Sequence, residues 1–285
     1  GYLWLGTESG LLRFDGVRFV PWEDLWAVPQ PHASVRAVCA ARDGALWFGT
    51  AEPGAIGVIA GDTVRMYGEA DGLPPGMVTA LVQAADDTLW AAGRFGVVRL
   101  VEGRWTPAGE GLPPGVVNDL VIAPDGAVLA GAATGVYRRP RHAAAFHPVG
   151  VSRDAVRSIA LGPDGRMWRT DPIVGVRAVA APDGAPDPAA PRARGARLLH
   201  DSRGDLWVGT GGQGLWRLRH DAAGAVSLFQ RTSTVTGLSD DGATSMIEDR
   251  EGNVWVATRD GLNRLTPYKV TPILDLGLVN AVDVT

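Results

Sequence analysis

Short runs of mainly apolar residues, each four or five residues long, recur along the whole chain. They are separated by clusters of Gly, Asp and Pro, which favour tight turns. No segment carries apolar residues at helical spacing over ten or more positions. The pattern therefore predicts β-strands throughout. A clear set of four strands is expected at 35–38, 46–50, 56–59 and 64–67.

Turn residues join these four runs into one antiparallel unit. Asp43-Gly44 separates the first two runs, and this pair predicts a two-residue hairpin turn because Asp and Gly tolerate positive φ. Gly61-Asp62 separates the last two runs in the same way. A segment rich in Gly and Pro, 71–76, then leads to a new run at 77–81. The order of strands and turns thus begins again about 40 residues later.

One motif marks the second strand of each unit. It reads Asp-Gly-x-Leu-Trp-x-Gly-Thr, then a few small or polar residues, then Gly-Leu-x-Arg. Successive copies are 43, 43, 39, 39, 39 and 48 residues apart. Such a period indicates a stacked supersecondary unit that cannot bury its apolar faces alone. The seven copies are anchored at Trp4, Trp47, Trp90, Leu129, Trp168, Trp207 and Trp255.

Four short strands in each repeat of this length are typical of a β-propeller blade. A large flat side chain at the anchor position fits between stacked blades, so the motif tryptophans are expected in the core. The sequence predicts an all-β, seven-bladed β-propeller of four-stranded antiparallel blades, with residues 1–285 as a single domain. The fourth and fifth blades are degenerate. Leu129 replaces Trp, and four prolines within 181–191 disfavour a regular outer strand there.

The end of the chain offers a strand that the first blade lacks. The sequence begins at the second strand of that blade, and residues 279–282 align with the first strand at 35–38. Segment 279–285 is therefore expected to complete the first blade, which would remove two open sheet edges. The same segment is also compatible with the start of an eighth blade. Because the sequence opens within a motif, we expect a fragment of a longer protein.

Composition narrows the classes of function. The chain of 285 residues is 46% hydrophobic and 20% charged, with a formal net charge of −4. It contains no basic tract, so a nucleic-acid partner is not expected. No run approaches the roughly 20 apolar residues of a membrane-spanning helix, so no membrane segment is expected in this fragment. The single cysteine, Cys39, excludes an internal disulfide and is expected in the core.

The motif set resembles the two-component regulator propeller repeat. Residues 240–265 carry it most fully, and residues 204–218 repeat it. Gly-Leu pairs at 72–73, 111–112 and 237–238 are similar to the punctuation of that family. The resemblance covers the whole chain, strongly in the first, sixth and seventh blades and weakly in the fourth and fifth.

This resemblance implies the extracytoplasmic sensor region of a bacterial transmembrane histidine kinase or related receptor. It implies a periplasmic location, with the parent protein in the inner membrane. A second propeller or a β-sandwich domain of the same chain is the expected neighbour, and the parent receptor is expected to form a homodimer. Some family members detect oligosaccharides, so a small polar ligand such as an oligosaccharide is expected. The family offers no catalytic motif to carry over and implies no cofactor.

Enzymatic chemistry has little support in the sequence. No two of the five histidines are spaced i, i+2 or i, i+4, and no serine-hydrolase, zinc or calcium-loop motif occurs. Neither a catalytic residue nor a metal site is therefore expected. Two alternatives stay open: a propeller lyase or lactonase with an axial active site, and a structural propeller that supports a second, ligand-binding one. Several acids recur with the repeat and are expected to cap turns: Asp43, Asp125, Asp164, Asp201 and Asp249.

A binding site is expected where two sets of loops meet. In a propeller, the loop after the second strand and the loop before the first strand lie on one face, around an axial funnel. Arginine and amide side chains there would suit a polar, anionic or sugar-like ligand. A tryptophan in the loop after the first blade would stack on a sugar, contact a neighbouring domain or pack under its own loop. The candidate ligand-binding residues are Arg36, Arg94, Asn118, Arg157, Arg259, Asn280 and Trp26.

Overall fold

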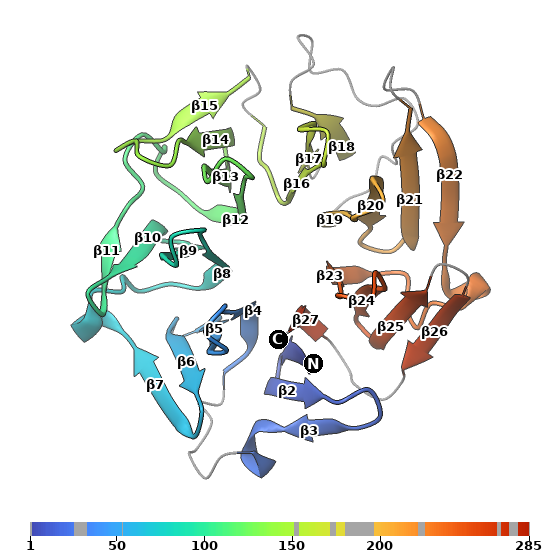
Figure 1. The fold of residues 1–285 in the computed structure, drawn as a ribbon, viewed down its shortest axis with the longest axis horizontal. Coiled ribbons are helices and arrows are strands. Elements are labelled where there is room, and N and C mark those ends of the chain that lie inside the picture. The colour runs from blue at the N-terminus through green and yellow to red at the C-terminus, as the bar shows by residue number, and fades with distance from the viewer. Residues whose placement is uncertain are drawn as a thin grey trace. The chain divides into compact units, whose positions relative to one another are not determined.

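A computed structural model describes residues 2–25, 33–52, 54–150, 154–171, 175–179, 197–221, 226–266, 269–273 and 279–284. Within these residues the strands form seven sheets, six with four strands and one with three (Figure 1). The other regular elements described are three single turns of 3-10 helix. The fold is all-β, and the sheets are the blades of a seven-bladed β-propeller, as the sequence predicts.

The blades follow one another along the chain. The first blade contains β1 (Leu3–Thr7), β2 (Gly10–Phe14), β3 (Phe19–Pro21) and β27 (Val279–Val284). The second contains β4 (Val35–Ala40), β5 (Leu46–Thr50), β6 (Ile56–Ala60) and β7 (Thr63–Tyr67). The third contains β8 (Val78–Gln83), β9 (Leu89–Gly93), β10 (Gly96–Val101) and β11 (Arg104–Pro107). The fourth and fifth contain β12 (Val117–Ile122), β13 (Val128–Ala132), β14 (Gly135–Arg139) and β15 (His147–Val149); and β16 (Ile159–Leu161), β17 (Met167–Asp171) and β18 (Gly175–Ala178). The sixth and seventh contain β19 (Arg197–His200), β20 (Asp205–Gly209), β21 (Leu215–His220) and β22 (Val226–Thr232); and β23 (Ala243–Glu248), β24 (Val254–Thr258), β25 (Gly261–Thr266) and β26 (Lys269–Ile273). The 3-10 turns are η1 (Trp22–Asp24), η2 (Glu69–Asp71) and η3 (Thr234–Thr236).

The first blade joins the two ends of the chain. Its strand order is β27-β1-β2-β3, so the last strand pairs beside the first (Figure 1). The prediction that segment 279–285 completes this blade is confirmed, and the alternative that it begins an eighth blade is wrong. Pairing with β27 gives the backbone groups on the open side of β1 their partners, which removes an exposed sheet edge.

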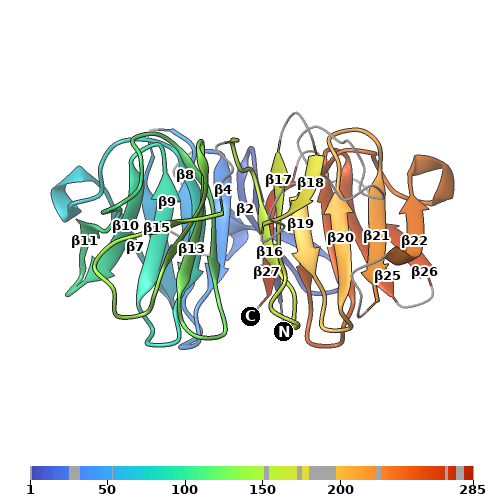
Figure 2. The same ribbon diagram turned by 90° about the horizontal axis from the view of Figure 1, so that it is seen from above.

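The chain divides into two compact units. The first contains Gly1–Ala132, Tyr137–His147 and Asn280–Thr285, and the second contains Ala133–Val136 and Pro148–Val279. In the first unit, β8 lies between β4 and β12 (Figure 1), and Figure 2 shows β4 and β8 from the side. In the second unit, β19 has β16 and β23 as neighbours. The first strands of successive blades are therefore packed side by side within each unit.

The motif glycine allows the next blade to approach closely. A side chain on Gly6 would begin 2.7 Å from Cγ1 of Val35, and one on Gly209 would begin 2.6 Å from Cβ of Ala243. Val35 and Ala243 are the first residues of the next blades' first strands. Because protein interiors are close-packed, any larger residue at this motif position would push the two blades apart.

The motif threonine closes the loop after the second strand. The Oγ1 hydroxyl of Thr7 donates to the carbonyl of Gly10 at 2.9 Å, and that of Thr258 donates to the carbonyl of Gly261 at 2.9 Å. Both threonines are buried. A buried carbonyl requires a partner, so the hydroxyl stabilises the tight connection to the third strand.

The motif tryptophans lie in the core, as the sequence predicts. Trp207 and Trp255 are 7% and 5% exposed. The Nε1 group of Trp207 donates to Oδ2 of Asp201 at 2.8 Å, and that of Trp255 donates to Oδ2 of Asp249 at 2.6 Å. In both pairs the acid precedes the tryptophan by six residues, and its Oδ1 atom accepts backbone N–H groups of the turn. The acids thus join each turn to the core.

The turn at Asp43-Gly44 differs from the prediction. The loop spans residues 41–45, because the flanking strands pair only as far as residues 40 and 46. Gly44 has a φ of 85°, whereas Oδ1 of Asp43 accepts the backbone N–H of Ala45 at 3.0 Å. This capping bond favours a wider turn over the predicted two-residue turn. At Gly61-Asp62 the two-residue turn is confirmed, because residues 60 and 63 are paired.

The degenerate blades differ in how much of them is described. In the fourth blade, the side chain of Leu129 is fully buried at the anchor position. The fifth blade contains three described strands, and its predicted irregular segment at 181–191 lies outside the described residues. Among the described helical turns, none is long or apolar enough to cross a membrane.

Candidate functional site

A β-bulge recurs at the candidate position of the first strand. In four blades the pairing with the second strand shifts after the strand's first residue, which leaves one residue out of the ladder. An unpaired bulge residue bends its strand and redirects its side chain. All four bulge residues are half-buried, and two of them are predicted site residues. They are Arg36, Thr79, Asn118 and Thr244.

The bulge side chains connect neighbouring strands and blades. The Nη1 group of Arg36 donates to Oδ1 of Asn280, on β27 of the first blade, at 3.1 Å. Oγ1 of Thr79 donates to the carbonyl of Val117, on β12 of the fourth blade, at 2.5 Å. Oγ1 of Thr244 donates to the carbonyl of Ala257 within its own blade at 3.2 Å. Arg36 and Thr79 therefore connect the first strands of neighbouring blades, whereas Thr244 connects two strands of its own blade.

Arg36 and Asn280 form one hydrogen-bonded pair. Asn280 is 8% exposed, and its Nδ2 group donates to Oγ of Ser34 at 3.3 Å. The Nε group of Arg36 is buried and has no hydrogen-bond partner among the described residues. Asn280 thus holds the guanidinium in place, while Arg36 retains donor capacity. Sequence reasoning identified both residues but missed Ser34, which lies just before β4.

Arg94 lies at the same end of β8 as the bulge. It is exposed and directly follows β9. Its backbone N–H donates to the carbonyl of Met77 at 3.2 Å, and its Cβ atom lies 3.1 Å from where a side chain on Gly76 would begin. Both residues immediately precede β8. The predicted meeting of the loop after the second strand with the loop before the first strand is confirmed in this blade.

The second unit repeats this meeting of loops. The backbone N–H of Ala243 donates to the carbonyl of Thr210 at 2.8 Å, which ties the loop after β20 to the start of β23. Arg259 is exposed, and its Nε atom lies 3.3 Å from where a side chain on Gly242 would begin. Arg259 therefore lies beside the residue that precedes β23, as Arg94 lies beside the residues that precede β8.

Arg157 lies before β16, also in the second unit. It is exposed, and its backbone N–H donates to the carbonyl of Thr170 at 3.1 Å. The carbonyl of Arg157 accepts a hydrogen bond from Nη1 of Arg197 at 3.4 Å. The Nε group of Arg197 donates to the carbonyl of Thr244 at 3.0 Å. Arg197 thus connects β19 to β23 and to the segment before β16.

Two tryptophans follow the first blade. Trp22 is fully buried, and its ring packs edge-on against Phe48 with the ring centroids 5.5 Å apart. The predicted site residue Trp26 lies outside the described residues. Its expected role in ligand binding therefore stays a prediction.

Among the described residues, no three His, Cys, Asp or Glu side chains gather as a metal site would require. His200 ends β19, at the opposite end of that strand from Arg197. Burial lowers the pKa of His200, although the charges of Asp164 and Asp201 oppose this effect. The turn acids Asp43, Asp125 and Asp164 each accept the backbone N–H two residues later, at 3.0 to 3.1 Å. Their predicted capping role is confirmed.

Comparison with known proteins supports the resemblance seen in the sequence. Residues 237–260 match the two component regulator propeller family. This segment begins directly after η3 and includes β23 and β24 of the seventh blade. No curated protein sequence matches the chain.

Solved structures share the fold at low sequence identity. The extracellular domain of BT4673 from B. thetaiotaomicron, described as a one component or hybrid two component system, matches 92% of this chain with a TM-score of 0.62 and 17% identity. The chain spans 44% of that structure. A streptogramin B lyase matches 96% of this chain and 90% of its own with a TM-score of 0.73 and 15% identity. A catalytically inactive virginiamycin B lyase from Staphylococcus aureus with quinupristin matches 87% of this chain and 86% of its own, with a TM-score of 0.68 and 13% identity. At these identities the likeness establishes the fold.

Proposed function

We propose that this chain is a non-catalytic, ligand-binding sensor propeller of a bacterial two-component receptor, and that it works outside the cytoplasm. The observation that carries the proposal is the repeated bulge, which brings polar side chains to one end of the first strands. The family match over residues 237–260 supports the signalling role. The likeness to the extracellular domain of BT4673 supports the location.

In the first unit, Arg36 and Arg94 are the groups best suited to a polar ligand. Arg36 is positioned by Asn280, and Arg94 is exposed beside the loop before β8. A guanidinium presents a rigid fork of donors that matches carboxylate, phosphate or neighbouring hydroxyl groups. Asn118 is the bulge residue of the fourth blade. Arg157 and Arg259 are the corresponding candidates in the second unit.

Signalling would follow from the bonds that the bulge residues already make. Arg36 joins β4 to β27, and Thr79 joins β8 to β12. A ligand that competes for these donors favours one arrangement of the blades over another. That preference would change how the propeller docks on the next domain, proposed here to be a second propeller or a β-sandwich of the same chain. A homodimeric parent histidine kinase in the inner membrane would then read the difference.

The test is a thermal-shift screen of sugars, organic acids and phosphates, followed by mass spectrometry of each ligand recovered after overnight incubation. A ligand that binds the folded state raises the melting temperature by mass action. The proposal expects at least one such ligand, recovered chemically unchanged. Turnover of a ligand would contradict the non-catalytic role.

A propeller lyase is the second candidate function, because solved structures of lyases share the fold. The lyase match covers 90% of the lyase chain, against 44% for BT4673. A lyase requires an acid–base group beside its substrate. Among the described histidines, His200 has a pKa that burial lowers, and it ends β19, at the opposite end of that strand from Arg197. If turnover is found, the variant His200→Ala identifies whether this end of the strand carries it.

A further inference from the structure

The third blade lacks a carboxylate that the sixth and seventh blades possess. Six residues before the motif tryptophan, those two blades carry Asp201 and Asp249, and the third blade carries Ala84. The indole Nε1 group of Trp90 has no hydrogen-bond partner among the described residues, although Trp90 is only 6% exposed. An unsatisfied buried donor is costly, so this position calls for an acceptor.

The turn itself has the same backbone in all these blades. The N–H of Ala84 donates to the carbonyl of Thr88 at 2.9 Å, and the N–H of Asp87 donates to the carbonyl of Ala84 at 3.0 Å. In the seventh blade the matching bonds, from Asp249 to Asn253 and from Gly252 to Asp249, measure 2.9 and 3.0 Å. The missing group is therefore only the side-chain carboxylate.

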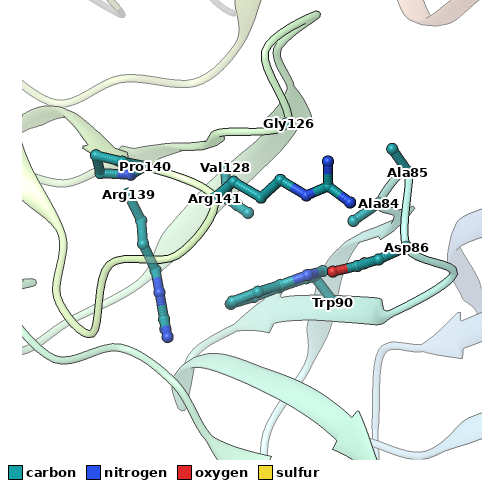
Figure 3. Close-up of a pocket in the computed structure, with 9 residues that line it drawn as sticks. All are labelled: Ala84, Ala85, Asp86, Trp90, Gly126, Val128, Arg139, Pro140 and Arg141. Atoms are coloured by element: carbon teal, nitrogen blue, oxygen red, sulfur yellow. The ribbon is translucent and has the colours of Figure 1, made fainter.

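A small pocket opens where that carboxylate would lie (Figure 3). Its cavity volume is about 20 Å³, which suits a water molecule or a carboxylate head rather than a sugar. In Figure 3 the indole nitrogen of Trp90 is turned toward the segment that carries Ala84 and Asp86. Arg141 extends toward the same segment, and Arg139 lies by the opposite end of the indole ring. All of these residues belong to the first unit.

Buried positive charge makes the pocket suitable for an anion. Arg139 is 7% exposed, and its guanidinium lies 5.0 Å from the ring centroid of Trp90. Its Nε and Nη1 groups donate to the backbone carbonyls of Ala143 and Ala108 at 2.8 and 2.9 Å. Among the described residues, no carboxylate forms an ion pair with it. Burial lowers the pKa of Arg139, and the charge of Glu110 opposes this effect. A buried cation without an ionic partner favours an anion nearby.

One acid opposes this charge at the rim. Burial raises the pKa of Asp86, but hydrogen bonds from Thr88 and the charge of Arg141 outweigh it, so its pKa lies below the usual value. Asp86 is exposed and therefore partly screened by water, whereas Arg139 is buried. Asp87 is paired with Arg42 at 2.8 Å. The lining thus keeps one buried cation and one buried N–H donor for a ligand.

We propose that the pocket beside Trp90 binds a carboxylate group supplied from outside the repeat, in the place that Asp201 and Asp249 fill in their own blades. The carboxylate accepts from Nε1 of Trp90, and Arg139 and Arg141 supply positive charge to the same pocket. Its source is either a free small carboxylate or an aspartate or glutamate side chain of a bound acidic segment. This site lies at the opposite end of β8 from the bulge residue Thr79.

The test follows the indole N–H resonances of ¹⁵N-tryptophan-labelled protein during titration with sodium acetate, at constant ionic strength set with sodium chloride. The Trp90 resonance is assigned by its loss in Trp90→Phe. The proposal expects a saturable shift of this resonance, with the resonances of Trp207 and Trp255 unchanged. A blocked Asp-containing tetrapeptide forms a second arm. Saturation by acetate with no response to the peptide indicates a free carboxylate, and tighter response to the peptide indicates an acidic segment. No saturable shift in either arm overturns the proposal.

Two variants provide an independent check. Ala84→Asp supplies the missing carboxylate, so the melting temperature should rise by about 2 to 4 °C and the Trp90 resonance should no longer respond to acetate. Ala123→Asp is the matched control, because its turn has the same backbone bonds but the anchor residue is Leu129, which offers no N–H. This control should lower the melting temperature. Equal destabilisation by both substitutions would overturn the proposal.

Discussion

At the scale of single residues, the motif tryptophan and the acid six positions before it act together. The carboxylate of Asp249 accepts from the indole of Trp255 and from the turn of its own blade. Burial alone would raise the pKa of Asp249, but hydrogen bonds from Asn253, Trp255 and Glu251 outweigh it and lower the pKa below 3.8. These bonds favour the ionised form in the folded state.

Asp249→Ala should therefore destabilise the protein by about 2 to 4 kcal/mol at neutral pH, because several bonds to a charged acceptor are lost. The effect depends on pH with a definite sign. The unfolded carboxyl takes up its proton near pH 3.8, before the folded one does, so the stability that Asp249 contributes is present above this pH and is lost as the pH falls through the folded pKa. Urea unfolding of both proteins between pH 7 and pH 3 measures this. A difference that does not shrink in acid would contradict the assignment.

Trp207→Ala should cost about 3 to 5 kcal/mol, because it empties a large volume from a core cluster that includes Leu215, Leu238 and Met246. Trp207→Phe keeps most of the packing but loses the bond to Asp201, so it should cost less. Urea unfolding again gives the comparison. A loss under about 1 kcal/mol for the alanine variant would mean that the ring contributes little to blade packing.

At the scale of elements, β27 is the strand on which the first blade depends. It pairs with β1, and its side chains also reach β4 of the second blade: Asn280 accepts from Arg36, and Oδ2 of Asp283 accepts the backbone N–H of Ala40 at 2.7 Å. Cys39 lies beside this contact. Burial, with a further contribution from Asp283, raises the pKa of its thiol to about 12.

Cys39 packs toward the third blade, in a cluster with Val78 and Leu81. Deleting residues 278–285 should lower stability by several kcal/mol, so opening of the second blade should expose Cys39 more often. In the intact protein the neutral, buried thiol should resist maleimide at pH 7.5, because the thiolate is the reactive form. The truncated protein should label roughly tenfold faster or more. Asp283→Asn is the control, since it keeps the strand and should label only slightly faster than the parent. If the truncated chain melts at the parent's temperature and labels no faster, the closing role of β27 is wrong.

Much of the strand arrangement could be predicted from the sequence. The spacing of the anchor residues predicted the number of blades, and the match between 279–282 and 35–38 predicted the closing strand. The bulge was not predictable in detail, since it depends on how the first strand fits the next blade rather than on a local residue type. The pocket beside Trp90 was missed, although aligning the repeats at position 84 reveals the absent acid. The predicted two-residue turn at Asp43-Gly44 was wrong because this pair is compatible with more than one loop length.

At the scale of the whole molecule, the motif residues are accounted for by packing, which leaves the variable positions for recognition. Gly, Thr and Trp of the motif fix the blades, and the acids fix the turns. The bulge and loop residues differ from blade to blade, as Arg36, Thr79 and Asn118 do. A repeat fold therefore provides a constant frame with a variable set of polar side chains at one end of its first strands.

The most direct test of this account is a calorimetric titration of a ligand found in the screen against the parent protein, Arg36→Ala and Arg94→Ala. Arg104→Ala serves as the control, since Arg104 is exposed on β11 and lies outside the candidate site. Loss of a charge-assisted hydrogen bond should weaken binding by about 1.5 to 3 kcal/mol, or roughly 10- to 150-fold in Kd. The account predicts this loss for Arg36→Ala or Arg94→Ala, with Arg104→Ala unchanged and the ligand intact. Unchanged affinity in all three variants would contradict it.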